Sequence, residues 1–82
     1  IPSSIESIGK SAFQACTSLI KIEIPSSVKM INEIAFKECT SLKHFKVLSP
    51  DASIYENILD GCTSLTRKEI PKTVNWLKHV EV

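Results

Sequence analysis

The sequence predicts a single domain with an α/β-type solenoid fold, in which short parallel strands stack on one side and short helical or irregular segments return the chain on the other. Three observations lead to this prediction. The tetrapeptide Cys-Thr-Ser-Leu begins at Cys16, Cys39 and Cys62, each time 23 residues further along. An Ile-Pro pair recurs in the same frame, and apolar residues alternate just before it. A fixed period of about 20 to 30 residues is typical of solenoids, whose coils bury their apolar side against neighbouring coils.

Aligned on the tetrapeptide, the domain 1–82 divides into coils 1–23, 24–46 and 47–69 and a partial fourth copy, 70–82. The first residues fall inside a repeat and lack the features of a signal peptide, so we expect this chain to be part of a longer array. Open ends of such an array expose apolar core and sheet edges. End-to-end self-association is therefore a further expectation.

We expect the strands at 19–24, 42–47 and 65–70, because the residues there alternate between apolar and polar with a period of two. The three segments have the same phase in the repeat, which predicts one parallel sheet on one side of the solenoid. Pro25 and Pro71 end two of these strands, since proline offers no backbone N–H to a neighbouring strand.

The return segments have a different spacing. Apolar residues between Ile8 and Cys16 are four, one and three residues apart, which fits one or two turns of helix. Ser11, Asn32 and Asn57 lie near the starts of these segments, and we expect them to cap the helical turns. A small residue beside a large one, as in Ala12-Phe13 and its equivalents, allows the rings of successive coils to stack.

The third copy departs from the pattern at Asp51, Ile58, Leu59 and Lys68. Asp51 and Lys68 take positions that are apolar in the first two copies. A buried lysine would cost several kcal/mol, so we expect this coil to be distorted or to lie near an end of the array. The final stretch offers four apolar residues as a cover for the core: Trp76, Leu77, Val80 and Val82.

Written as Ile-Pro-x-x-Val/Ile-x-x-Ile-x-x-x-Ala-Phe-x-x-Cys-Thr-Ser-Leu-x-x-Ile-x, the repeat resembles those of the BspA-like leucine-rich repeat family. The resemblance extends from Ile1 to about Leu77. It implies a curved, right-handed leucine-rich repeat array with its parallel β-sheet on the concave face. It also implies a cell-surface or secreted protein of the kind that bacteria and protozoan parasites use for adhesion to host proteins.

Composition and charge argue against several classes of function. Ten Lys and Arg residues against nine Asp and Glu give a net charge of +1, which is too small a field for nucleic-acid binding. No apolar run approaches the roughly 20 residues of a membrane span, so we expect no membrane insertion.

The three cysteines occupy one column of successive coils, and their even spacing is unlike that of zinc sites. Equivalent atoms in adjacent coils lie about 4.8 Å apart, but parallel side-chain directions disfavour a disulfide. We expect free, buried thiols, and no cofactor or metal.

We predict that the chain is a protein–protein interaction module of the adhesion type, with no catalysis, and that it binds a protein or an acidic glycan on its strand face. The sequence has two histidines, His44 and His79. Enzyme chemistry is disfavoured because the cysteines are expected to face inward, whereas His44 is expected to face outward. The alternative is a passive structural spacer, which the absence of aromatic residues on the strand face supports. The residues expected to contact a partner are Lys21, Glu23, His44, Lys46, Arg67 and Glu69.

These six residues form two predicted columns. One column, Lys21, His44 and Arg67, is basic, which disfavours protonation of His44 between two cations and suits an acidic partner. The other column reads Glu, Lys, Glu along the stack, and its opposite charges are expected to satisfy one another.

Overall fold

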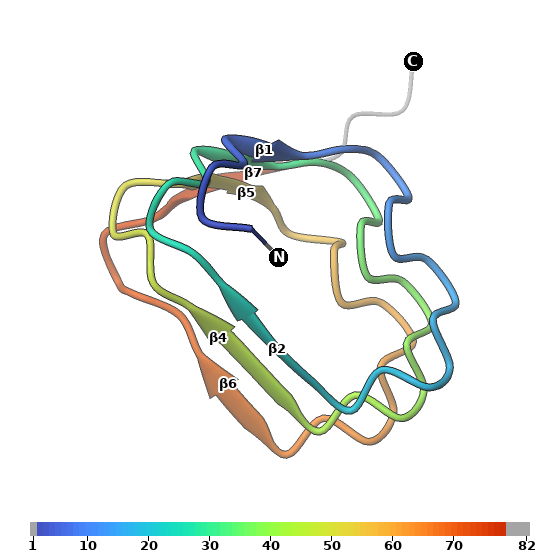
Figure 1. Cartoon of the computed structure of the whole chain (residues 1–82). Helices are drawn as coiled ribbons and strands as arrows, with labels where there is room; N and C mark the ends of the chain where they lie inside the picture. Colours follow the sequence, from blue (N-terminus) through green and yellow to red (C-terminus); the bar gives the residue numbers. More distant parts are fainter. Residues whose placement is uncertain (1, 79–82) are drawn as a thin grey trace.

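The computed structural model describes residues 2–78, which form about three turns of a solenoid built from parallel strands (Figure 1). The prediction of a repeat solenoid is confirmed. The α/β character and the helical returns are wrong, because no helix occurs among residues 2–78. One sheet, along the top of Figure 1, has the order β1-β3-β5-β7, and the other, at the lower left, has the order β2-β4-β6. The strands are β1 (Ser7–Ile8), β2 (Lys21–Ile24), β3 (Met30–Ile31), β4 (His44–Val47), β5 (Ser53–Tyr55), β6 (Arg67–Glu69) and β7 (Asn75–Leu77).

The β2-β4-β6 sheet is the one predicted from the alternating residues. Every register pair is 23 residues apart, as in Lys21 with His44 and His44 with Arg67. Each strand begins two residues later than predicted. The reason is local, because the N–H of the tetrapeptide leucine closes a turn onto the cysteine carbonyl, as Leu19 does onto Cys16 at 3.1 Å.

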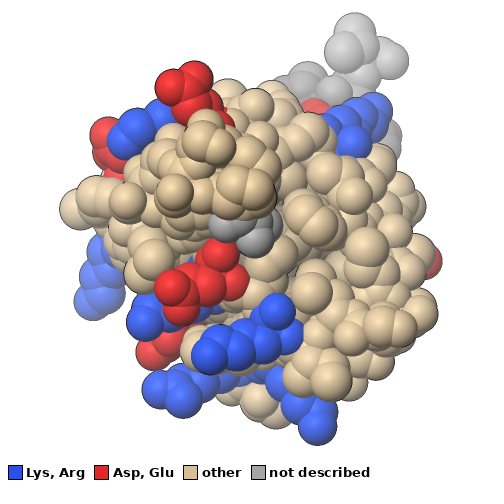
Figure 2. Space-filling view, in the orientation of Figure 1, with Lys and Arg blue, Asp and Glu red and all other residues tan. Residues whose placement is uncertain are grey.

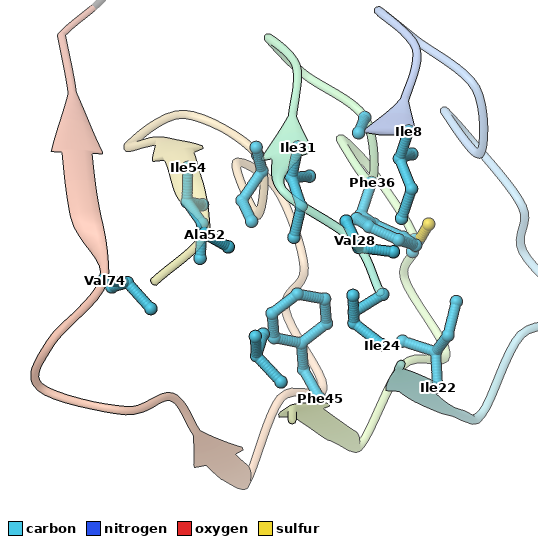
Figure 3. Close-up of a cluster of buried hydrophobic side chains, with 14 of the residues drawn as sticks. Ile8, Ile22, Ile24, Val28, Ile31, Phe36, Phe45, Ala52, Ile54 and Val74 are labelled. Carbon is cyan, nitrogen blue, oxygen red and sulfur yellow. The ribbon is translucent and has the colours of Figure 1, made fainter. Parts of the chain in front are cut away.

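The second sheet was not predicted, and the expectation of a single sheet is therefore wrong. Its strands are only two or three residues long, too short for an alternating pattern to stand out. They pair in parallel from coil to coil, with Ile8 beside Ile31 and Ile31 beside Ile54. These isoleucines point inward and help to fill the space between the two sheets (Figure 3).

The returns, stacked on the right of Figure 1, consist of consecutive tight turns. Ser11 and Ile34 have φ values of 60° and 50°, and Ala15 and Glu38 have 58° and 60°. A residue with positive φ interrupts a right-handed helix, which is why the predicted helical turns do not form. The backbone instead bonds between coils, as where the Phe13 N–H donates to the Ala35 carbonyl at 2.8 Å.

The predicted caps have another role. Asn32 donates from Nδ2 to the Ile8 carbonyl at 2.8 Å, and the Asn57 side-chain oxygen accepts from the Ile34 N–H at 3.3 Å. Both bonds join neighbouring coils. Ser11 lies within a turn in the left-handed conformation, so none of the three caps a helix.

The core is built from columns of equivalent residues (Figure 3). Phe36 lies fully buried in the middle coil, stacked on Phe13 with ring centroids 5.2 Å apart and edge-on to Phe45 at 5.3 Å. Phe13 is only half-buried, because the described residues provide it with a neighbouring coil on one side alone. Stability is therefore concentrated in the middle coil.

The third coil is distorted, as expected. Ala52 takes the inward place that the alignment gives to Asp51, and Asp51 turns outward to pair with Lys29 Nζ at 3.0 Å. The hydrogen bond from Lys29 lowers the pKa of the Asp51 carboxyl. The fourth copy then pairs with an offset of 22 residues, Ser53 beside Asn75.

The last layer within the described residues is exposed at Lys68 and Trp76. Lys68 stands beside Phe45 in the inward column, yet it is exposed, so it escapes the cost of burial. Trp76 is 51% exposed and Leu77 is half-buried, which makes them a partial cover for the core. The other two predicted cover residues, Val80 and Val82, lie outside the described residues, as does His79.

Candidate partner-binding face

The outward side of the β2-β4-β6 sheet carries all six predicted contact residues. Ile22 and Ile24 alternate inward along β2, which turns Lys21 and Glu23 outward. The same alternation in β4 buries Phe45 and Val47. The face is thus a direct consequence of the period of two in each coil.

The register confirms the two columns. Lys21, His44 and Arg67 are neighbours across the three strands, and so are the residues two places further on. In Figure 2 blue Lys and Arg side chains gather at the lower left, where Figure 1 places this sheet, with red acidic side chains between them. The face is therefore mixed in charge, with basic residues in the majority.

Glu69 does not pair as predicted. Its Oε2 lies 2.9 Å from His44 Nε2 and its Oε1 lies 3.5 Å from Arg67 Nη2, so its carboxylate crosses to the basic column. An ionised carboxylate can only accept, which makes His44 Nε2 the donor. The hydrogen bond from His44 is the main cause that lowers the pKa of Glu69, followed by the nearby charges of Arg67 and Lys46.

This pairing changes the expectation for His44. Sequence columns alone place His44 between two cations, whereas the structure adds a carboxylate in hydrogen-bond contact with the ring. The contact joins residues that are 25 positions apart and lie in different columns, so column-by-column reasoning could not reveal it. The sequence signal that could have revealed this contact is a glutamate two residues after a basic residue in the adjacent strand.

The edge of the face is apolar at one point. Ile20 is 58% exposed and lies immediately before β2, while Lys43 and Thr66 hold the equivalent places in the next coils. Thr66 Oγ1 donates to the Lys43 carbonyl at 3.2 Å, which fixes this edge. The exposed aromatic residue Trp76 belongs to β7 in the other sheet, so it does not contribute to this face.

The cysteine column consists of free thiols. Cys39 is buried, whereas Cys16 and Cys62 are half-buried, so full burial was predicted correctly only for the middle coil. Burial is the main cause that raises the pKa of the Cys39 and Cys62 thiols, which makes them poor nucleophiles. Within residues 2–78 no group of three or more His, Cys, Asp or Glu is placed to hold a metal ion.

Among the described residues no hydrogen bond joins a cysteine to a histidine. His44 contacts Glu69, and Cys39 and Cys62 bond to backbone carbonyls on the inner side. The surface formed by residues 2–78 has no pocket, and this part of the chain contains no helix with the length and hydropathy to cross a membrane.

Stacked 23-residue coils with a constant core and a charged strand face define a repeat-solenoid protein. Its repeats match the family described as BspA type leucine-rich repeat region (6 copies) over residues 1–79. The chain belongs to this family, as its repeat motif indicated. No curated protein and no solved structure matches it. The family suggests a repeat-protein module for binding or for structural support, and leucine-rich repeats of this kind are typically non-catalytic.

Proposed function

We propose that the chain is a protein–protein interaction module of a surface or secreted leucine-rich repeat protein, and that it acts in adhesion through the outward face of β2-β4-β6. The observation that carries the proposal is the composition of this face. Three coils place six charged or titratable side chains in register there, on strands whose inward residues are held by a common core. Surfaces of this kind allow the outward residues to vary without loss of the fold.

A protein is the partner that best suits the face. Its two columns present both donors and acceptors, since Glu23 and Glu69 stand beside the basic residues. Exposed Ile20 at the edge adds apolar area that a protein surface can bury. Membership of the family supports a binding role, and the adhesive role and the surface location belong to the proposal.

The passive spacer is the competing function. It is favoured by one observation, that Trp76 lies on the other sheet and no aromatic residue stands among the six on this face. Interfaces usually gain most of their affinity from buried aromatic and arginine side chains. Arg67 is the one arginine in the sequence, and it lies on the proposed face.

The test is a binding panel. The immobilised chain is exposed to purified extracellular host proteins, and affinity is measured by interferometry for wild type and for a Lys21→Ser, Arg67→Ser variant. A Lys10→Ser, Lys37→Ser variant, with equal loss of charge on the return side, is the control. We expect at least one protein to bind wild type and control equally and the face variant more weakly. Absence of any face-dependent binding would support the spacer instead.

A further inference from the structure

Glu69 shows how this face holds a carboxylate. His44 and Arg67 are register neighbours in β4 and β6, and Glu69 stands two residues after Arg67. From there its two oxygens reach both residues, at 2.9 Å to His44 Nε2 and 3.5 Å to Arg67 Nη2. A carboxylate thus lies across two basic side chains of adjacent coils.

The repeat creates an equivalent place one coil earlier. Lys21 and His44 are register neighbours in β2 and β4, and the residue two places after His44 is Lys46. The chain therefore puts an ammonium group where the next coil has its carboxylate. Among the described residues neither Lys21 nor Lys46 forms an ion pair, since the ion pairs there involve Lys29, His44 and Arg67.

We propose that the place bounded by Lys21, His44 and Lys46 binds a carboxylate side chain from an acidic, extended segment of a partner protein. The inference rests on the proposed function, because it specifies the chemistry of a partner for the same face. Two lysine ammonium groups supply strong donors, and charge-assisted hydrogen bonds to a carboxylate are about twice as strong as neutral ones. The two sides of the place are set by strands β2 and β4, so it is held by regular backbone.

The surrounding charges favour separate carboxylates over a dense polyanion. Glu23 and Glu69 are the register neighbours of Lys46 on either side, and both would repel a closely spaced row of sulfates. The chain as a whole carries a net charge of only +1, so it lacks a long-range field that would offset this repulsion. A peptide in which acidic residues alternate with neutral ones avoids the conflict.

The experiment uses the full chain labelled with ¹⁵N, and its probe is a short peptide in which Glu alternates with Thr. We expect the amide signals of β2 and β4 to shift on titration, and not with the Gln counterpart of the peptide. Lys46→Glu should weaken peptide binding by roughly tenfold, and Lys46→Gln by less. Lys10→Glu makes the same change of charge on the return side and should bind as wild type does. Lys46→Gln guards against misfolding, because Lys46→Glu places like charges beside Glu23 and Glu69.

Equal binding of the peptide by wild type and both Lys46 variants would overturn the inference, and so would an equal loss in Lys10→Glu. A sulfated oligosaccharide that binds more tightly than the peptide, with the same dependence on Lys46, would replace the acidic peptide as the ligand class. A host protein that binds wild type and Lys46→Glu equally, yet loses affinity for the Lys21→Ser, Arg67→Ser variant, would leave the proposed function standing and remove only the carboxylate site.

Discussion

The Cys39 thiol donates a hydrogen bond to the carbonyl oxygen of Phe13, with Sγ and oxygen 3.1 Å apart. Cys62 repeats this contact with Phe36 at 3.2 Å. The cysteine of each coil thus bonds to the coil before it, and it also fills the core beside the phenylalanine column. Threonine or serine at position 39 would place a hydroxyl at a different distance from the Phe13 carbonyl. Alanine would remove the hydrogen bond that the thiol donates to this carbonyl.

Replacing Cys39 by alanine should lower the free energy of unfolding by about 1 to 2 kcal/mol, from the lost hydrogen bond and the small cavity. Urea denaturation measures it. Cys16→Ala is the control, because Cys16 is half-buried and its thiol has no carbonyl partner within residues 2–78. An equal loss in both variants would mean that the bond between coils adds no stability.

Stability should fall as the pH rises beyond about 9. Burial raises the pKa of Cys39 and Cys62 above the ordinary value of 9.0, so the unfolded chain releases these protons at a lower pH than the folded one. The stabilisation from these two protonated thiols is complete at pH values below their pKa in the unfolded chain. It is lost as the pH rises through their pKa in the folded chain. The readout is the difference in unfolding free energy between wild type and a Cys39→Ala, Cys62→Ala variant. That difference should shrink as the pH rises, and a constant difference would contradict the assignment.

Much of the fold follows from the sequence because the same pattern of apolar and polar residues recurs in each coil. The 23-residue period predicts the division into coils. The alternation of apolar and polar residues around Ile22 and Phe45 predicts the β2-β4-β6 sheet and its outward face. The return side could not be predicted in the same way. Its spacing suits a helix, but left-handed residues such as Ile34 break it, and bonds to neighbouring coils replace those that a helix would make.

The candidate face shows the same division. The register placed the six residues together, since strand pairing is set by the repeat. The reach of Glu69 to His44 depends on side-chain conformations across two columns, and the repeat period alone does not set these conformations. The same applies to Asp51, where one shifted residue after Pro50 turns an apparent core position outward.

Phe36→Ala should lower the free energy of unfolding by about 3 to 5 kcal/mol, enough to unfold so small a domain. Phe36 is fully buried and contacts the rings of Phe13 and Phe45. Phe13→Ala removes the same side chain from a half-buried place in the first coil, so it should cost clearly less. Thermal and urea melts of the two variants provide the comparison, and a cost below about 1 kcal/mol for Phe36 would contradict the core described above.

Gly61 and Ala15 should respond in opposite ways to exchange of glycine and alanine. Both have positive φ, 78° and 58°, at the same position of the repeat. An added Cβ at Gly61 would lie 3.0 Å from Glu38 Cγ, so Gly61→Ala should destabilise by about 1 kcal/mol or more. Ala15→Gly relieves the left-handed strain at an exposed place and should stabilise by up to about 1 kcal/mol, partly offset by the greater freedom of the unfolded chain. Denaturation midpoints in urea measure both, and destabilisation by Ala15→Gly would refute the strain argument.

The pKa of Glu69 should rise when its partner is removed. The hydrogen bond from His44 is the main cause of its lowered value, so His44→Thr should return the pKa of Glu69 part of the way toward the ordinary 4.5. Arg67 and Lys46 remain and keep it from returning fully. Carbon-detected NMR titration of the carboxyl group measures the shift.

Lys29→Thr is the matched control, because it removes the main partner of Asp51 and should raise the pKa of that carboxyl alone. A carboxyl whose pKa is lowered by folding stabilises the fold at pH values above its unfolded-state pKa. This stabilisation is lost as the pH falls through the folded-state pKa, so the wild type should lose more stability in acid than His44→Thr does. A Glu69 pKa that is unchanged by His44→Thr would show that the contact does not persist in solution.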